Sequence, residues 1–373
     1  MKKPIIIALT ILLSSFYSCK SEISEKTTSK DEEVHVDPLV HFEKVDAFLA
    51  ELAGEPQKFK VSSDTLSIVT GKNGTIINVD PNSLETVDGS PIGKEIEVKL
   101  VEMVTLKDFL TNNAQTVSNG EVIETGGAYD ITMFSDGKEL KIKNGKSIQV
   151  EFPRISEKDM EVFMGERDSL GQVNWEATGE DFKKKDLAEP EKPSRTIAFS
   201  INGSESEKTM TDKEYEQYLK SNKGYLKRMG DIERKNRTYK RKNRTYEAIN
   251  ILDLGLCNVD RFRTGNTPNT NIIVKLKNTE SIEGGVRVFA VYNEFNGILS
   301  QSIFRNAGKT SFNSVPVSSK MNIIALSADD YGSYFYETTI NTTIDASDTI
   351  EISLAKMSNQ EIEKRISTIK GID

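Results

Sequence analysis

The residues whose types and spacing could do chemistry are concentrated in one basic stretch between Lys220 and Arg244. This stretch holds eleven Lys and Arg residues and two acidic residues, so its net charge is +9. Cationic side chains at this density could bind a polyanion, such as anionic lipid headgroups, a surface glycan or a nucleic acid. The candidate contacts are Lys235, Arg237, Lys240, Arg241, Lys242 and Arg244.

A structural role is the alternative interpretation of the same stretch. Aromatic or apolar residues recur at every seventh position, which keeps them on one face of a helix: Tyr218, Tyr225, Ile232, Tyr239 and Tyr246. Residues 234–239 also recur unchanged as residues 241–246. A stripe of this kind could pack on a neighbouring domain and leave the basic side chains solvated. We expect this structural role and keep polyanion binding as the alternative.

Other reactive residue types are scarce. The chain has two Cys and two His, and Cys257 lies in an apolar stretch that favours a buried thiol over a nucleophile. Since no phosphate loop, nucleophile elbow or metal-ligand motif is present, we expect no catalytic residue, no metal site and no cofactor. An envelope carbohydrate-active enzyme that uses a pair of carboxylates remains an alternative. Trp175 would then stack on a glycan, although a lone Trp more often lies in a core.

The N-terminus carries a targeting signal. Lys2 and Lys3 precede an apolar stretch over residues 5–13, which is shorter than the roughly 20 residues that span a bilayer. This stretch and the following Cys19 resemble a bacterial lipoprotein signal of the looser Bacteroidetes type. The resemblance implies cleavage before Cys19, lipidation of Cys19 and a lipid-anchored location in the cell envelope, on the periplasmic or surface face of the outer membrane. An ordinary secretory signal cleaved near Ser18 is the alternative.

Period-two alternation dominates much of the rest, as in Ile96, Val98 and Leu100, and Gly-containing turns separate the short segments. The pattern predicts a mainly β chain of two antiparallel β-sandwich domains joined by a long basic helix, with a short C-terminal helix. Capping boxes at Thr211 and Ser358 mark the two helix starts. The predicted order is a signal peptide (1–18), a flexible tether (19–37), a short helix (38–54), β-sandwich domain 1 (55–155), a linker or irregular segment (156–210), the basic helix (211–247), β-sandwich domain 2 (248–356) and the C-terminal helix (357–373).

The first predicted sandwich has a family resemblance. Residues 74–81, 93–98, 124–129 and 145–153 resemble the β-sandwich module of ankyrins and netrin receptors, and the same pattern is similar to that of uncharacterised Bacteroidetes-type lipoproteins. The resemblance implies a protein-interaction or scaffold module. Some relatives of that module cleave themselves at a His-Phe-Ser site; the similar string here, His41-Phe42-Glu43, lacks the Ser, so self-cleavage is not expected.

Composition limits the choice of function. The chain has 373 residues, a net charge of −8, 36% hydrophobic and 28% charged residues, which excludes collagen-like, wholly disordered and polytopic membrane classes. Nucleic acid is not expected as a partner, because the chain as a whole is acidic. We expect a lipid-anchored cell-envelope binding or scaffold protein without catalytic activity. Its partners would be the membrane, through the lipid anchor, and another envelope protein or a glycan.

Overall fold

The computed structural model describes residues 41–187, 196–201, 203–221, 223–264, 267–342 and 348–369. The predicted signal peptide, Cys19 and the predicted tether lie outside these residues. The described chain is mainly β, with several antiparallel sheets, as the alternating pattern predicts.

The first group of strands forms two sheets around one apolar cluster. The larger sheet has the order β1 (Gln57–Ser62), β5 (Glu95–Met103), β7 (Glu121–Ser135), β15 (Gly255–Phe262), β10 (Glu161–Arg167) and β11 (Val173–Asp181), with β4 (Leu84–Thr86), β6 (Val117–Ser118) and β8 (Lys138–Ile142) beside this path. The smaller sheet has the order β14 (Ile249–Ile251), β9 (Ile148–Glu151), β3 (Ile76–Val79) and β2 (Ser67–Thr70). In β5, Ile96, Val98 and Leu100 are fully buried, which confirms the predicted inner face of the sheet.

The second group also forms two sheets around an apolar cluster. One sheet has the order β19 (Lys309–Pro316), β16 (Asn269–Leu276) and β22 (Asp348–Ile352), and β16 and β22 are parallel. The other has the order β18 (Ile298–Ile303), β17 (Val286–Tyr292), β20 (Lys320–Asp329), β21 (Gly332–Asn341) and β23 (Ala355–Met357). Every residue of β17 is buried, because both faces of this strand are covered.

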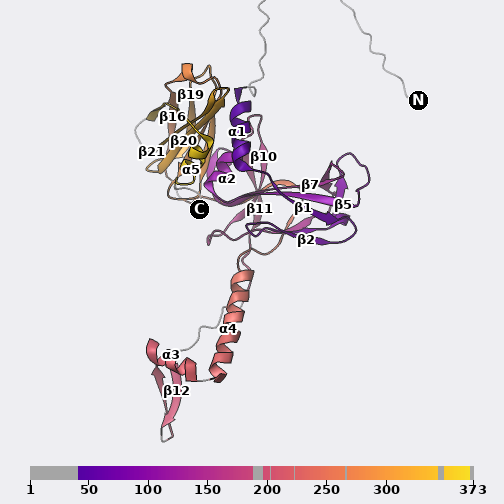
Figure 1. Cartoon of the computed structure of the whole chain (residues 1–373), viewed down its shortest axis with the longest axis vertical. Helices are drawn as coiled ribbons and strands as arrows, with labels where there is room; N and C mark the ends of the chain where they lie inside the picture. Colours follow the sequence, from indigo (N-terminus) through magenta and orange to yellow (C-terminus); the bar gives the residue numbers. More distant parts are fainter. Residues whose placement is uncertain are drawn as a thin grey trace, which may run out of the picture. The chain divides into compact units, whose positions relative to one another are not determined.

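Three helices help to form a third apolar cluster, which contains side chains from both groups of strands. They are α1 (Glu43–Ala53), which packs against β20 (Figure 1), α2 (Leu106–Thr111) and α5 (Asn359–Ile366). Ser358 caps α5 by accepting a hydrogen bond from the Glu361 backbone, which confirms the helix start expected there. Two short 3₁₀ helices, η2 (Pro81–Ser83) and η3 (Thr279–Ser281), lie in the connections.

Two differences from the predicted segmentation concern strands. Residues 156–210, expected to be a linker, contain β10 and β11 as well as the two-stranded hairpin of β12 (Thr196–Ile201) and β13 (Ser204–Thr209). Furthermore, β14 and β15 follow the basic segment but pair with strands of the first group. The reason is that β15 fills the central position between β7 and β10 in the larger sheet. The long segment that precedes β14 and β15 adds little entropic cost to this pairing, because the cost of closing a loop grows slowly with its length.

The predicted basic helix over 211–247 is two helices, α3 (Asp212–Ser221) and α4 (Lys223–Lys242). The side chains of Thr211 and Glu214 each accept a hydrogen bond from the other residue's backbone, so the predicted capping box is present at the start of α3. Helix α4 ends at Lys242, because the next residues form backbone bonds with the first group of strands.

Candidate polyanion-binding site on helix α4

Five of the six basic residues singled out from the sequence lie in the C-terminal half of α4, and Arg244 lies in the turn that follows it. All six side chains are exposed. Within the described residues, none of the six forms an ion pair, whereas the neighbouring Arg234 pairs with Asp231 at 3.0 Å. The six side chains are Lys235, Arg237, Lys240, Arg241, Lys242 and Arg244, and we call them the α4 basic surface.

The helix divides this surface into two faces. Arg237, Lys240 and Arg241 have the spacing i, i+3, i+4, which places them along one side of α4, and Arg244 follows in the turn after the helix. Lys235 and Lys242 are seven residues apart and line a cavity of about 320 Å³ together with Tyr239, Thr238, Arg234 and Leu187. One side therefore carries three cationic groups, with the acidic Glu233 one turn before Arg237, and the other combines cationic groups with an aromatic ring.

Repulsion between these charges is offset only in part. Lys240, Arg241 and Lys242 lie in the last turn of α4, where the helix dipole favours cations by roughly 0.3–1 kcal/mol each. Arg237 and Arg241, however, are like charges at the destabilising i, i+4 spacing. A bound anion would relieve this repulsion, so the surface is suited to binding anions.

The duplicated hexapeptide anchors this surface to the first group of strands through its second copy. Tyr246 is completely buried, donates its hydroxyl to the carbonyl of Ser156 at 3.2 Å and lies 5.0 Å from the ring of Phe182. Its backbone N–H donates to the carbonyl of Phe152 at 3.0 Å. Burial raises the pKa of the Tyr246 hydroxyl to about 12. In the first copy, the equivalent Tyr239 is only half-buried on α4.

Arg154 explains why the second copy leaves the helix. Its guanidinium donates to the side-chain oxygen of Asn243 at 2.7 Å, and its backbone N–H donates to the carbonyl of Arg244 at 2.7 Å. The equivalent oxygen in the first copy, on Asn236, is buried and has no hydrogen-bond partner within the described part of the chain. Arg154 therefore supplies a helix stop that the identical first copy lacks.

Two other residues with potential chemistry are in the core. The Cys257 thiol is buried, and burial raises its pKa to about 12, which leaves it protonated and unreactive. Trp175 is fully buried and donates its indole N–H to the carbonyl of Gln115 at 2.6 Å. Both residues are thus core residues, as favoured from the sequence, and the indole is not available to stack on a glycan.

Sequence reasoning missed a buried polar cluster between β7 and β15. Asp260 is fully buried, and the side-chain amide of Asn258 donates to one of its oxygens at 2.6 Å. Thr125 donates to the side-chain oxygen of Asn258 at 3.2 Å. Burial raises the pKa of Asp260 well above its ordinary value. The period-two spacing of Asn258 and Asp260 places them on one face, but only the strand pairing shows that this face is buried.

No known protein family model matches the chain, and no curated protein is similar to it in sequence. Among the helices in the described residues, none has the length and apolarity needed to cross a membrane.

Proposed function

We propose that this protein is a lipid-anchored cell-envelope binding protein without catalytic activity, which holds a polyanionic surface through α4. The observation that carries the proposal is the α4 basic surface, whose six cationic side chains are exposed and without ion pairs in the described chain. The purely structural role would require the aromatic stripe on α4 to be packed, and Tyr239 is only half-buried there, which favours binding.

The anion that suits this surface best is an array of anionic lipid headgroups. Tyr239 and Leu187 line the same cavity as Lys235 and Lys242, and an aromatic ring among basic side chains is typical of segments that lie at a bilayer interface. Lipidation of Cys19 would hold α4 near such a surface. In this case the lipid chain and the basic helix would act as two membrane-binding signals.

We extend the proposal to the architecture of the protein. Two β-sandwich modules, one built from β1–β11 with β14 and β15 and the other from β16–β23, would be joined by the connection between β15 and β16. The segment that contains the basic helix would be an insertion in the first module, before β14. Support comes from the separate apolar cluster enclosed by each pair of sheets. The resemblance of the first module to those of ankyrins and netrin receptors adds an interaction or scaffold role towards another envelope protein.

Vesicle co-sedimentation tests the headgroup proposal with the full chain carrying Cys19→Ser, so that binding does not depend on lipid. On vesicles with about one-third phosphatidylglycerol, each basic side chain should contribute roughly 1 kcal/mol. Reversing Arg237, Lys240, Arg241 and Arg244 to Glu should therefore weaken binding by at least about 100-fold. Binding by the unreversed protein should also fall steeply as salt rises from about 0.05 to 0.5 M.

A matched variant controls for net charge. It reverses four cationic residues that lie outside α4 and are also exposed: Lys72, Lys94, Lys146 and Arg305. This variant should bind vesicles within a few-fold of the unreversed protein. Equal losses in the two variants, or no vesicle binding by the unreversed protein, would contradict the headgroup proposal. Salt-sensitive binding to an acidic glycan or to DNA, without vesicle binding, would assign the α4 basic surface to that other polyanion.

The carbohydrate-active enzyme lacks comparable support. That alternative depended on Trp175 lining a cleft beside two carboxylates, and the indole is fully buried. We therefore do not propose it.

A further inference from the structure

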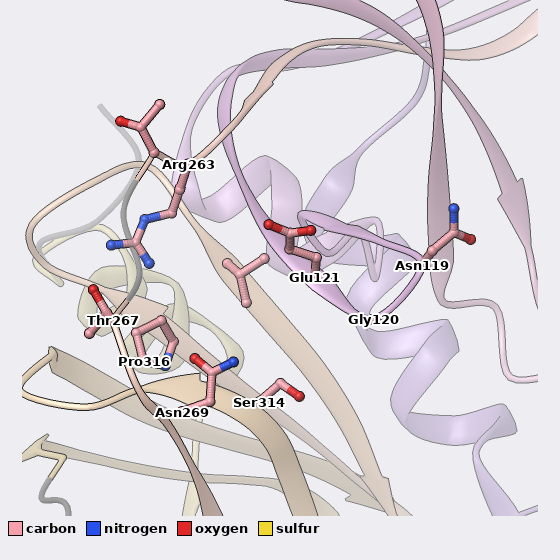
Figure 2. Close-up of a pocket in the computed structure, with 10 residues that line it drawn as sticks. Asn119, Gly120, Glu121, Arg263, Thr267, Asn269, Ser314 and Pro316 are labelled. Carbon is pink, nitrogen blue, oxygen red and sulfur yellow. The ribbon is translucent and has the colours of Figure 1, made fainter.

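A pocket of about 320 Å³ lies between residues from three parts of the fold (Figure 2). The turn between β6 and β7 forms one wall, the residues after β15 form another, and β16 and β19 form the third. Seven of its ten lining residues have polar side chains, while Val122 and Pro316 are the apolar ones. The volume is at the low end of the range for small-molecule sites, and the lining suits a polar ligand.

Arg263 is the cationic residue of this pocket. The centre of its guanidinium lies 3.9 Å from the ring centroid of Phe295, and Phe295 in turn stacks on Tyr292 at 4.4 Å. Within the described chain, the guanidinium has no ion pair or hydrogen bond. Because the Phe295 ring covers one side of the guanidinium and its N–H groups have no partner in the described chain, it can bind a carboxylate through two parallel hydrogen bonds.

Glu121 lies across the pocket from Arg263 and favours hydrogen-bond donors over anions (Figure 2). Its carboxylate is exposed, has no ion-pair partner among the described residues and can only accept hydrogen bonds while ionised. The carboxylate would repel a simple anion but would accept hydrogen bonds from hydroxyl groups. Thr267, Asn269 and Ser314 line the same pocket and can both donate and accept. The ligand that satisfies all of these groups carries one carboxylate and several hydroxyls.

The wall that carries Glu121 is held in place. Asn119 and Gly120 have φ values of 49° and 84°, as expected for the two central residues of a tight type I′ hairpin turn. Asn119 also receives a hydrogen bond from the Asn174 side chain at 3.3 Å, and its backbone donates to Asn174 at 2.9 Å. Little ordering of this wall would be needed on binding, which favours affinity for a small ligand.

We propose that this pocket binds an acidic saccharide unit of the hexuronate class, with its carboxylate on Arg263 and its hydroxyls on Glu121, Asn269 and Thr267. A peptide carboxyl terminus with an apolar last residue fits less well, since the pocket offers only Val122 and Pro316 to its side chain. The proposal is independent of the α4 basic surface.

Calorimetric titration of the full chain with glucuronate, glucose and acetate tests the proposal. Glucuronate should bind at least about tenfold more tightly than either of the other probes, because only glucuronate engages both Arg263 and the acceptor groups. Arg263→Ala should weaken glucuronate binding by about 10-fold to 100-fold, the range expected for loss of hydrogen bonds to a charged group. Glu121→Gln should weaken glucuronate binding but not acetate binding, because acetate has no hydroxyl that donates to Glu121 and is repelled by its carboxylate.

Three controls make the result decisive. Arg305→Ala removes an exposed Arg elsewhere and should leave glucuronate binding unchanged. The variant with four Glu substitutions on α4 should also keep it, which separates this pocket from the α4 basic surface. Arg263→Lys retains the charge and should still bind poorly, since Lys lacks the planar fork. The proposal is overturned if glucuronate binds no more tightly than acetate, if Arg263→Ala binds like the unsubstituted protein, or if glucuronate does not bind.

Discussion

Replacing Tyr246 with Ala should destabilise the protein far more than replacing Tyr239, although the two residues end identical hexapeptides. Tyr246 is completely buried against Phe182, whereas Tyr239 is half-buried on α4. The pair is therefore a comparison within one chain, in which local sequence is constant and only the tertiary environment differs.

The magnitude follows from burial and one hydrogen bond. Truncating a fully buried aromatic side chain to Ala costs about 3–5 kcal/mol. Tyr246→Phe removes only the hydroxyl that donates to Ser156 and should cost about 1 kcal/mol. Tyr239→Ala loses part of its contact area but gains helix propensity, so its cost should stay below about 1 kcal/mol.

Urea unfolding and thermal unfolding, both followed by circular dichroism, measure these differences, with the urea midpoint and slope and the melting temperature reported for each variant. At roughly 2–4 °C per kcal/mol for a large domain, Tyr246→Ala should lower the melting temperature by about 10 °C and Tyr239→Ala by no more than a few degrees. If the two Ala variants were equally destabilised, Tyr246 would not be the anchor of the basic segment and the packing argument would fail.

Three further predictions concern other parts of the chain. Cys19→Ser should abolish labelling by a radioactive fatty acid and release the protein from its lipid anchor in cells; an unlabelled wild type would contradict the lipoprotein assignment. Asp260→Asn should stabilise the protein increasingly as pH rises above about 4, the ordinary pKa of Asp. The raised pKa of Asp260 keeps a proton in the folded state that the unfolded chain releases, so the carboxyl group lowers stability as pH increases. A stability difference that does not change with pH, measured from urea midpoints, would show that Asp260 is ionised when folded. Asp46→Ala should lower the free energy of unfolding by about 2–3 kcal/mol, because the buried Arg287 loses the carboxylate that its guanidinium contacts at 2.7 and 2.9 Å. The loss should be smaller than for a fully buried ion pair, because Asp46 is half-exposed. A loss below about 0.5 kcal/mol in chemical unfolding would show that Ser302 and the Phe42 ring suffice to hold Arg287.

The alternating strands and the capped helix starts could be predicted because their signals are local. Ile96, Val98 and Leu100 alternate in sequence, and a strand with one buried face requires this alternation. The cap of α5 joins the side chain of Ser358 to the backbone N–H of Glu361, three residues later in the chain. No tertiary information is therefore needed to place the start of α5.

The pocket beside Arg263 could not be predicted in the same way. Its walls come from the β6–β7 turn, the residues between β15 and β16, and β19, and these three stretches are far apart in the chain. Arg263 carries no sequence signal that sets it apart from other Arg residues. Only the approach of these segments in the fold brings Arg263 over the ring of Phe295 and into one pocket with Glu121 and other polar side chains.

The duplicated hexapeptide separates most clearly what the sequence determined from what the tertiary structure decided. The sequence alone determined the concentration of positive charge, the seven-residue spacing of the aromatic residues and the exact composition of both copies. The tertiary structure decided that the first copy is helical and that the second leaves the helix after Lys242 to bury Tyr246. The physical reason is that only the second copy lies within reach of Arg154 and of the apolar pocket formed by Phe182 and its neighbours, where hydrogen bonding and burial outweigh continuation of the helix.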